Sequence, residues 1–209
     1  MFRNIIFDLG NVFLFFDHGK FYRNFSSLEN SFTADELWKF VTSKRIDYKL
    51  SLGEFTPQQA FQSIKNEFKV KTGFRKFCQL YGDIFTPNNR MIQFFERSLF
   101  RNDHKFFLLS NTDAIHFNYI KKNFPIIMKI KYRVLSFEIG MLKPDVEIYK
   151  YLLIKYRIDP KETIFIDDIH ENIVVAETTG ITGIQYTSHS SFKDKYLALQ
   201  KSPHNSMRA

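Results

Sequence analysis

Three short apolar segments, each followed at once by polar or acidic residues, constrain the fold of this chain most strongly. They span residues 3–8, 105–110 and 163–168. Continuous apolar runs of this length are typical of parallel strands that are buried on both faces of a sheet. Residues 133–137 and 182–186 predict two further, weaker strands.

Helical patterns alternate with these strands. Residues 112–124 and 145–156 carry apolar side chains at three- and four-residue spacing. Residues 172–179 predict a short helix that is capped by Asn172 and closed by Gly180. The alternation predicts an α/β protein with a doubly wound, Rossmann-like parallel sheet.

The polar residues at the strand ends are expected to meet. Ligands of doubly wound sheets bind outside the carboxyl ends of the strands. Asp8, Ser110 and the pair Asp167 and Asp168 each follow or end a predicted strand. We therefore expect these side chains to converge at one edge of the sheet.

A purely helical region interrupts the α/β pattern. Its helical segments are residues 20–28, 34–44, 57–68 and 73–82. We expect residues 17–88 to form an inserted, small α-helical cap domain, and residues 1–16 and 89–201 to form the α/β core domain. The polar residues 202–209 are expected to fray.

Composition narrows the class of protein further. The chain has 209 residues, of which 44% are hydrophobic and 25% charged, as in globular proteins. Its single cysteine, Cys78, excludes an internal disulfide and a cysteine-cluster zinc site. We expect a cytoplasmic protein, because Asp8 interrupts the apolar N-terminus and no apolar run reaches the roughly 18 residues of a membrane span.

The net charge of +8 does not by itself indicate a polyanionic partner. The densest basic run, residues 121–133, contains no acidic residue, but elsewhere basic and acidic residues are mixed. A solvated surface explains this pattern better than a nucleic-acid groove. We expect no nucleic-acid or membrane partner, and a monomer or homodimer.

Four motifs share one explanation. In sequence order they are residues 7–12 (FDLGNV), 108–111 (LLSN), 140–144 (GMLKP) and 165–168 (FIDD). Together they resemble the motifs of the haloacid dehalogenase-like (HAD) hydrolases, and the helical insertion lies where that superfamily carries its small cap. Within the superfamily, the sequences of these motifs look most like those of the alpha-D-glucose-1-phosphate phosphatase-like branch. The resemblance implies a Mg²⁺-dependent phosphatase acting on a small phosphorylated metabolite.

The resemblance also implies a role for each motif residue. Asp8 would attack phosphorus and form an aspartyl-phosphate, with Lys143 neutralising Asp8 and the transferring group. Ser110 and Asn111 would bind the substrate phosphate. The metal ligands would be Asp8, the Gly10 carbonyl, Asp167 and Asp168, with Asp168 favoured as a direct ligand. Taken singly, Asp8 could cap a turn, Asn111 and the acidic pair could cap helices, and Lys143 could lie on the surface.

Motif I departs from the usual phosphatase pattern. Gly10 stands where these enzymes carry a second aspartate as general acid and base, and positioned acid–base catalysis is worth about 10²–10⁴-fold. An acidic leaving oxygen, as in a hexose 1-phosphate, would reduce the need for that acid. Alternatively, Asp17 or His18 could supply the proton.

Other functions stay open at this stage. Gly10 is also compatible with a weakly active or inactive phosphate-binding or regulatory protein. A dehalogenase would use the aspartate nucleophile without a metal, but the acidic pair argues against it. The histidines other than His18 show no metal-ligand spacing.

Overall fold

Five parallel strands form the central sheet. The computed structural model describes residues 2–99 and 104–201, so the expected frayed tail lies outside the described residues. The strand order is β5-β4-β1-β6-β7. The strands are β1 (Asn4–Phe7), β4 (Lys105–Ser110), β5 (Tyr132–Leu135), β6 (Thr163–Asp167) and β7 (Thr182–Gln185). In register, Phe7 pairs with Leu108 and Ile166, so the three motif-bearing strands end side by side.

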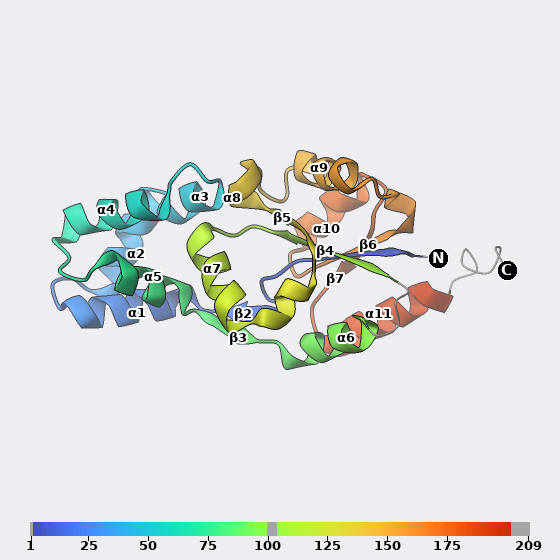
Figure 1. Ribbon diagram of the computed structural model, residues 1–209, viewed down its shortest axis with the longest axis horizontal. Coiled ribbons are helices and arrows are strands. Elements are labelled where there is room, and N and C mark those ends of the chain that lie inside the picture. The colour runs from blue at the N-terminus through green and yellow to red at the C-terminus, as the bar shows by residue number, and fades with distance from the viewer. Residues whose placement is uncertain (1, 100–103, 202–209) are drawn as a thin grey trace.

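Helices cover both faces of this sheet (Figure 1). One face packs against α9 (Val146–Tyr156) and α10 (His170–Glu177), and the other against α6 (Asn89–Leu99), α7 (Ala114–Asn123) and α11 (His189–Lys201). Side chains of β1 alternate between these layers, since Ile5 and Phe7 join one buried cluster and Ile6 the other. The predicted doubly wound α/β fold is confirmed.

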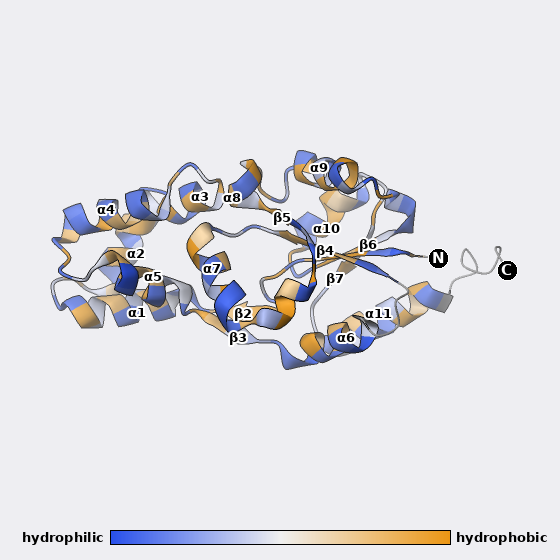
Figure 2. Cartoon of the chain, in the orientation of Figure 1, coloured by the Kyte–Doolittle hydropathy of each residue, from blue (hydrophilic) through white to orange (hydrophobic). Residues whose placement is uncertain are grey.

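The remaining helical segments of the described core are short. They are α8 (Ser136–Ile139) and the 3₁₀ helices η1 (Pro125–Lys129) and η2 (Pro160–Glu162). The longer helices carry both hydrophobic and hydrophilic residues (Figure 2), as expected for helices that bury one side against a core. No helix among residues 2–99 and 104–201 is long and apolar enough to cross a membrane.

Five helices gather at one end of the molecule (Figure 1). They are α1 (His18–Glu29), α2 (Ala34–Ser43), α3 (Ile46–Ser51), α4 (Pro57–Phe68) and α5 (Phe74–Gly82). They surround an aromatic-rich cluster of their own, which includes Phe21, Phe25 and Phe77. The exact division between cap and core at residues 16/17 and 88/89 stays a prediction.

A two-stranded antiparallel sheet joins the helical insertion to the core. It pairs β2 (Leu14–Phe16) with β3 (Phe85–Pro87), immediately before and after the helical insertion. The sequence did not predict these strands, nor α3, α6 and α11. Strands of three residues are too short for a hydrophobic period to be visible.

The predicted helix-capping role of Asn172 is wrong. Helix α10 begins at His170, so Asn172 lies inside it, and the capping position is Ile169. The Asn172 side chain instead donates hydrogen bonds to Asp167. The Asn172 amide therefore hydrogen-bonds to a carboxylate at the end of β6 rather than to the backbone at the start of the helix.

Candidate active site

Three carboxylates meet at the carboxyl edge of the sheet. Asp8 follows β1, Asp167 ends β6, and Asp168 comes next in the chain. Each offers one oxygen, and these oxygens lie within 4.8 Å of one another. Asp8 is 7% exposed and Asp167 is fully buried. Buried carboxylates this close repel one another unless cations balance them, so the arrangement fits a divalent cation with oxygen ligands.

Lys143 supplies part of that positive charge. Its Nζ lies 2.6 Å from Asp8 Oδ1 and 2.7 Å from Asp167 Oδ2. Burial alone would lower the pKa of Lys143, but the two carboxylates raise it, so the ammonium stays charged. Burial raises the pKa of Asp8 to about 7, against the attraction of Lys143 and together with repulsion from Asp167. One ammonium facing three carboxylates leaves negative charge for a cation to balance.

Amide groups hold the acidic pair in place. Asn172 Nδ2 donates to both carboxylate oxygens of Asp167 at 3.0 and 3.1 Å, and the Ile169 backbone N–H donates to Oδ1 at 2.8 Å. Asn11 Nδ2 donates to Asp168 Oδ2 at 2.9 Å. Asn11 has φ of 53°, a left-handed conformation that asparagine tolerates better than most residues. Sequence reasoning missed both asparagines as supports of the site.

Asn111 contacts the loop that carries Lys143. Its Nδ2 donates to the Lys143 carbonyl and its Oδ1 accepts from the Lys143 N–H, both at 2.9 Å. This side chain therefore holds the Lys143 backbone, whereas its expected contact with a substrate phosphate stays a prediction. Ser110 is buried at the end of β4 and lines the cavity described next.

A cavity of about 310 Å³ extends from the strand ends toward the helical insertion. Gly10 and Ser110 line it on the core side. A Cβ added at Gly10 would lie 2.9 Å from Cε1 of Phe16, so any side chain there requires the Phe16 ring to move. The Gly10 carbonyl accepts a hydrogen bond from Val12 N at 2.6 Å, and its second lone pair remains for a metal.

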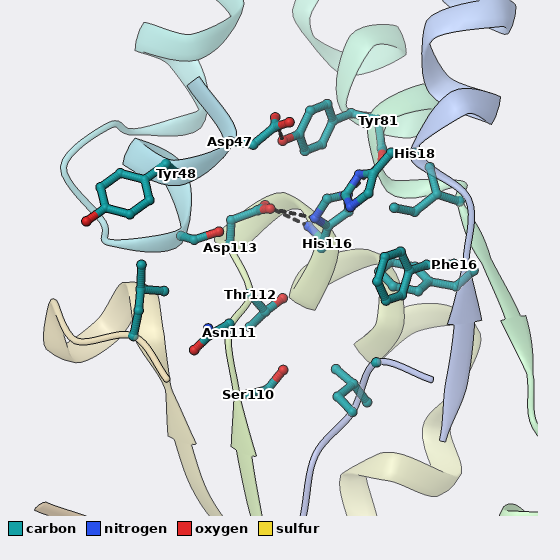
Figure 3. A pocket seen from close by; sticks show the side chains of 16 residues that line it. Phe16, His18, Asp47, Tyr48, Tyr81, Ser110, Asn111, Thr112, Asp113 and His116 are labelled. Atoms are coloured by element: carbon teal, nitrogen blue, oxygen red, sulfur yellow. Dashed lines mark hydrogen bonds and ion pairs between the residues drawn. The ribbon is translucent and has the colours of Figure 1, made fainter. Parts of the chain in front are cut away.

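The far wall of the cavity contains an aspartate–histidine pair (Figure 3). His116 Nδ1 lies 2.5 Å from Asp113 Oδ2, and its Nε2 donates to the Tyr81 carbonyl at 3.1 Å. Burial would lower the pKa of His116, but Asp113 outweighs it and the net pKa is raised. Burial would raise the pKa of Asp113, but His116 lowers it. The pair is therefore an imidazolium–carboxylate pair, which the sequence did not predict.

The two candidate substitute acids point to different places. Asp17 Oδ2 accepts from Arg23 Nη2 at 2.6 Å, and its side chain is 60% exposed. His18 lines the cavity and packs against Phe16 and His116, with ring centroids 5.1 and 5.9 Å apart. Of the two, only His18 lines this cavity.

Comparisons with known proteins identify one matching family and two similar phosphatases. A profile of haloacid dehalogenase-like hydrolases matches residues 26 to 185, a range that holds Ser110, Lys143 and the acidic pair and begins after Asp8. A D-ribitol-5-phosphate phosphatase of Bacteroides thetaiotaomicron is 22% identical over 212 residues, covering 97% of this chain and all of that protein. A sesquiterpene phosphatase of Aspergillus oryzae is 42% identical over 48 residues, and this match spans about a quarter of each chain.

Solved structures agree with this assignment. An HAD family enzyme from Bacteroides thetaiotaomicron, in complex with magnesium and inorganic phosphate, superimposes with a TM-score of 0.75 at 25% identity. The superposition covers 88% of this chain and 94% of that one.

Proposed function

Since the chain belongs to the haloacid dehalogenase-like hydrolase family, we propose that it is a Mg²⁺-dependent phosphomonoester hydrolase. The observation that carries the proposal is Lys143, whose Nζ bridges Asp8 and Asp167 inside a cluster of three carboxylates. An anionic phosphate needs a nucleophile, a cation and neutralising charge in one place. The magnesium and phosphate in the related Bacteroides structure support the same reading.

The residues divide the reaction between them. An Asp8 oxygen attacks phosphorus, the bond from phosphorus to the leaving oxygen breaks, and an aspartyl-phosphate forms. Water then hydrolyses this acyl phosphate, which releases inorganic phosphate and regenerates Asp8. Lys143 balances charge on Asp8 and on the transferring group, and Ser110 donates to a phosphoryl oxygen.

The metal site is proposed on the same residues. Asp8, Asp168 and the Gly10 carbonyl would hold Mg²⁺, with Asp167 beside them. Oxygen ligands of this kind suit Mg²⁺, which retains waters and substrate oxygens in its shell. Bound there, the ion would stabilise negative charge on the phosphoryl oxygens.

A small sugar or polyol phosphate is the proposed substrate. A cavity of about 310 Å³ lies at the small end of ligand sites. The full-length relative named a D-ribitol-5-phosphate phosphatase supports a polyol leaving group. A hexose 1-phosphate stays the expectation from Gly10, because its anomeric oxygen leaves more readily without a general acid.

A second candidate is a phosphate-binding protein with slow turnover. The observation in its favour is Gly10 itself, with the Phe16 ring occupying the space next to it. Such a protein would bind phosphate esters through the same residues, and Asp8→Asn would not change its residual rate.

One assay separates these functions. The substrates are p-nitrophenyl phosphate, glucose 1- and 6-phosphate and ribitol 5-phosphate, each with Mg²⁺ or with EDTA. Asp8→Asn is expected to lower turnover by on the order of 10⁴-fold. Asp35→Asn, an exposed helix carboxylate paired with Lys39, is the matched control and should keep the wild-type rate.

Each outcome has one meaning. Turnover that needs both Mg²⁺ and Asp8 supports the hydrolase, and a preference for glucose 1-phosphate supports the leaving-group explanation. No turnover even of p-nitrophenyl phosphate, together with Mg²⁺-dependent binding of a phosphate ester, favours the second candidate. Halide release from 2-chloropropionate in EDTA would instead indicate a dehalogenase.

A further inference from the structure

Asp47 is a cavity carboxylate that the catalytic proposal does not use. It lies on α3, half-buried, at the end of the cavity opposite Ser110 (Figure 3). Tyr81 Oη donates to Asp47 Oδ1 at 2.7 Å, and Tyr22 Oη donates to Oδ2 at 3.2 Å. Both tyrosines are buried, so these two donors fix the carboxylate in position. Each of its oxygens keeps a further lone pair.

Asp47 has no direct ion-pair partner, although the His116 imidazolium that pairs with Asp113 also acts on it through space. Among residues 2–99 and 104–201, no lysine, arginine or histidine nitrogen forms an ion pair with it. Asp113, the other carboxylate on this wall, is matched by His116. The wall therefore has a net negative charge, which agrees with the raised pKa of Tyr22, caused by burial and then by Asp47.

Part of the cavity lining is apolar and suits an uncharged carbon chain. The rings of Phe16, Tyr48 and Phe85 line the same cavity as Asp47. Apolar rings contact C–H groups, while a carboxylate accepts hydrogen bonds from hydroxyls. A second phosphate or carboxylate on the substrate would instead be brought next to a like charge.

We propose that Asp47 selects the leaving group: it accepts hydrogen bonds from substrate hydroxyls and excludes substrates with a second acidic group. This inference rests on the proposed function, because it places the substrate phosphate at Asp8 and the leaving group in the cavity. The expected substrates are small hydroxylated monophosphates. Bisphosphates and phosphorylated carboxylic acids are disfavoured.

The test compares Asp47→Asn with wild type on ribitol 5-phosphate, phosphoglycolate and p-nitrophenyl phosphate. Loss of charge-assisted hydrogen bonds is expected to lower kcat/KM for ribitol 5-phosphate by about 10–100-fold. The kcat/KM for phosphoglycolate should rise, and that for p-nitrophenyl phosphate should stay within a few-fold. If the ratio of kcat/KM for ribitol 5-phosphate to kcat/KM for phosphoglycolate is the same in Asp47→Asn and wild type, the proposal is overturned.

Two further variants distinguish an effect of the Asp47 charge from a general structural effect of the substitution. Asp83→Asn removes another tyrosine-bonded carboxylate, which accepts from Tyr119 Oη at 2.6 Å but does not line this cavity, and should leave the ratio unchanged. Tyr22→Phe removes one donor and keeps the charge, so it should still reject phosphoglycolate. A shift of the ratio by Asp83→Asn equal to that by Asp47→Asn would overturn the assignment.

Binding measurements keep the two proposals distinguishable. Calorimetric titration of ribitol 5-phosphate and phosphoglycolate into wild type and Asp47→Asn needs no turnover. If p-nitrophenyl phosphate is not hydrolysed, the hydrolase proposal fails. Weaker binding of ribitol 5-phosphate by Asp47→Asn would still support the proposal that Asp47 binds the hydroxyl groups of the ligand. If aminoethyl phosphate binds and ribitol 5-phosphate does not, Asp47 recognises an amine, and the hydroxyl assignment is wrong.

Discussion

Asn111 and Lys143 exchange two hydrogen bonds, each 2.9 Å long, between the side-chain amide of one and the backbone of the other. A single side chain thus satisfies both the N–H and the carbonyl of the residue whose Nζ bridges Asp8 and Asp167. The two residues come from separate loops, after β4 and before α9. The position of the ammonium therefore depends on an amide that never touches it.

Asn111→Ala is expected to displace Lys143 and to leave two of its backbone groups without partners. Lost hydrogen bonds and unsatisfied backbone groups cost about 1–3 kcal/mol of unfolding free energy. We expect kcat for p-nitrophenyl phosphate to fall by about tenfold or more, since a small misplacement of a charged group slows the reaction. Urea unfolding and steady-state rates measure the two effects. Asn118→Ala, an exposed position on α7, is the control, and equal rates for both variants would contradict the positioning role.

Asn172→Ala tests how Asp167 is held. Its Nδ2 contacts both oxygens of that carboxylate, and removing a hydrogen-bond partner from a metal-site carboxylate typically weakens metal affinity by about 10–100-fold. We expect the Mg²⁺ concentration for half-maximal activity to rise by that factor. Asn66→Ala removes an exposed helical amide that accepts a hydrogen bond from Gln62, and it should not shift the Mg²⁺ titration. A Mg²⁺ dependence equal to that of wild type would show that Asp167 does not need Asn172.

The sequence predicted the site residues at the strand ends well, but it predicted poorly the side chains that hydrogen-bond to them and hold them in position. Asp8, Ser110 and Asp167 follow buried apolar runs, and a parallel sheet brings such positions together whatever the loops do. The sequence predicts Asn172 as a helix cap because asparagine is common at that position, and only the tertiary contact with Asp167 shows the role of its side chain. Asp47 carried no signal at all, because its two tyrosine partners lie 25 and 34 residues away in sequence.

The Asp113–His116 pair predicts a specific dependence of stability on pH. The groups that face His116 are Asp113, His18, Asp47 and the Tyr81 carbonyl. Because the pKa of His116 is raised in the folded state, its contribution is complete below the ordinary value near 6.5 and is lost as the pH rises through the raised value.

Urea unfolding between pH 7.5 and pH 9 measures this effect, because Asp8, whose pKa is raised to about 7, also lowers stability as the pH rises at lower values. We expect the free energy of unfolding to fall with a slope of up to about 1.4 kcal/mol per pH unit in that window. His116→Gln should remove the slope. Asp113→Asn keeps a side-chain acceptor for the α7 N-terminus but removes the attraction, so it should remove the slope as well. If either variant keeps the wild-type slope, another group is responsible for it.

His18, which lines the cavity, is the predicted substitute for the acid missing at Gly10, and its pKa determines the expected pH dependence. Burial lowers that pKa, repulsion from His116 lowers it further, and Asp47, Asp113 and Asp17 oppose the shift. A proton donor must be protonated, so kcat for ribitol 5-phosphate should fall as the pH rises through a value below 6.5. His18→Ala should lower this kcat by about 10²-fold or more and abolish the pH dependence.

The choice of substrate and control decides whether His18 acts as an acid. The leaving group of p-nitrophenyl phosphate needs no proton, so His18→Ala should leave its turnover nearly unchanged, whereas a structural defect would slow both substrates alike. Asp17→Asn should affect neither substrate, because the Asp17 carboxylate faces Arg23 and solvent. If His18→Ala hydrolyses ribitol 5-phosphate at the wild-type rate and with the wild-type pH profile, the proton comes from water or the leaving oxygen departs without one.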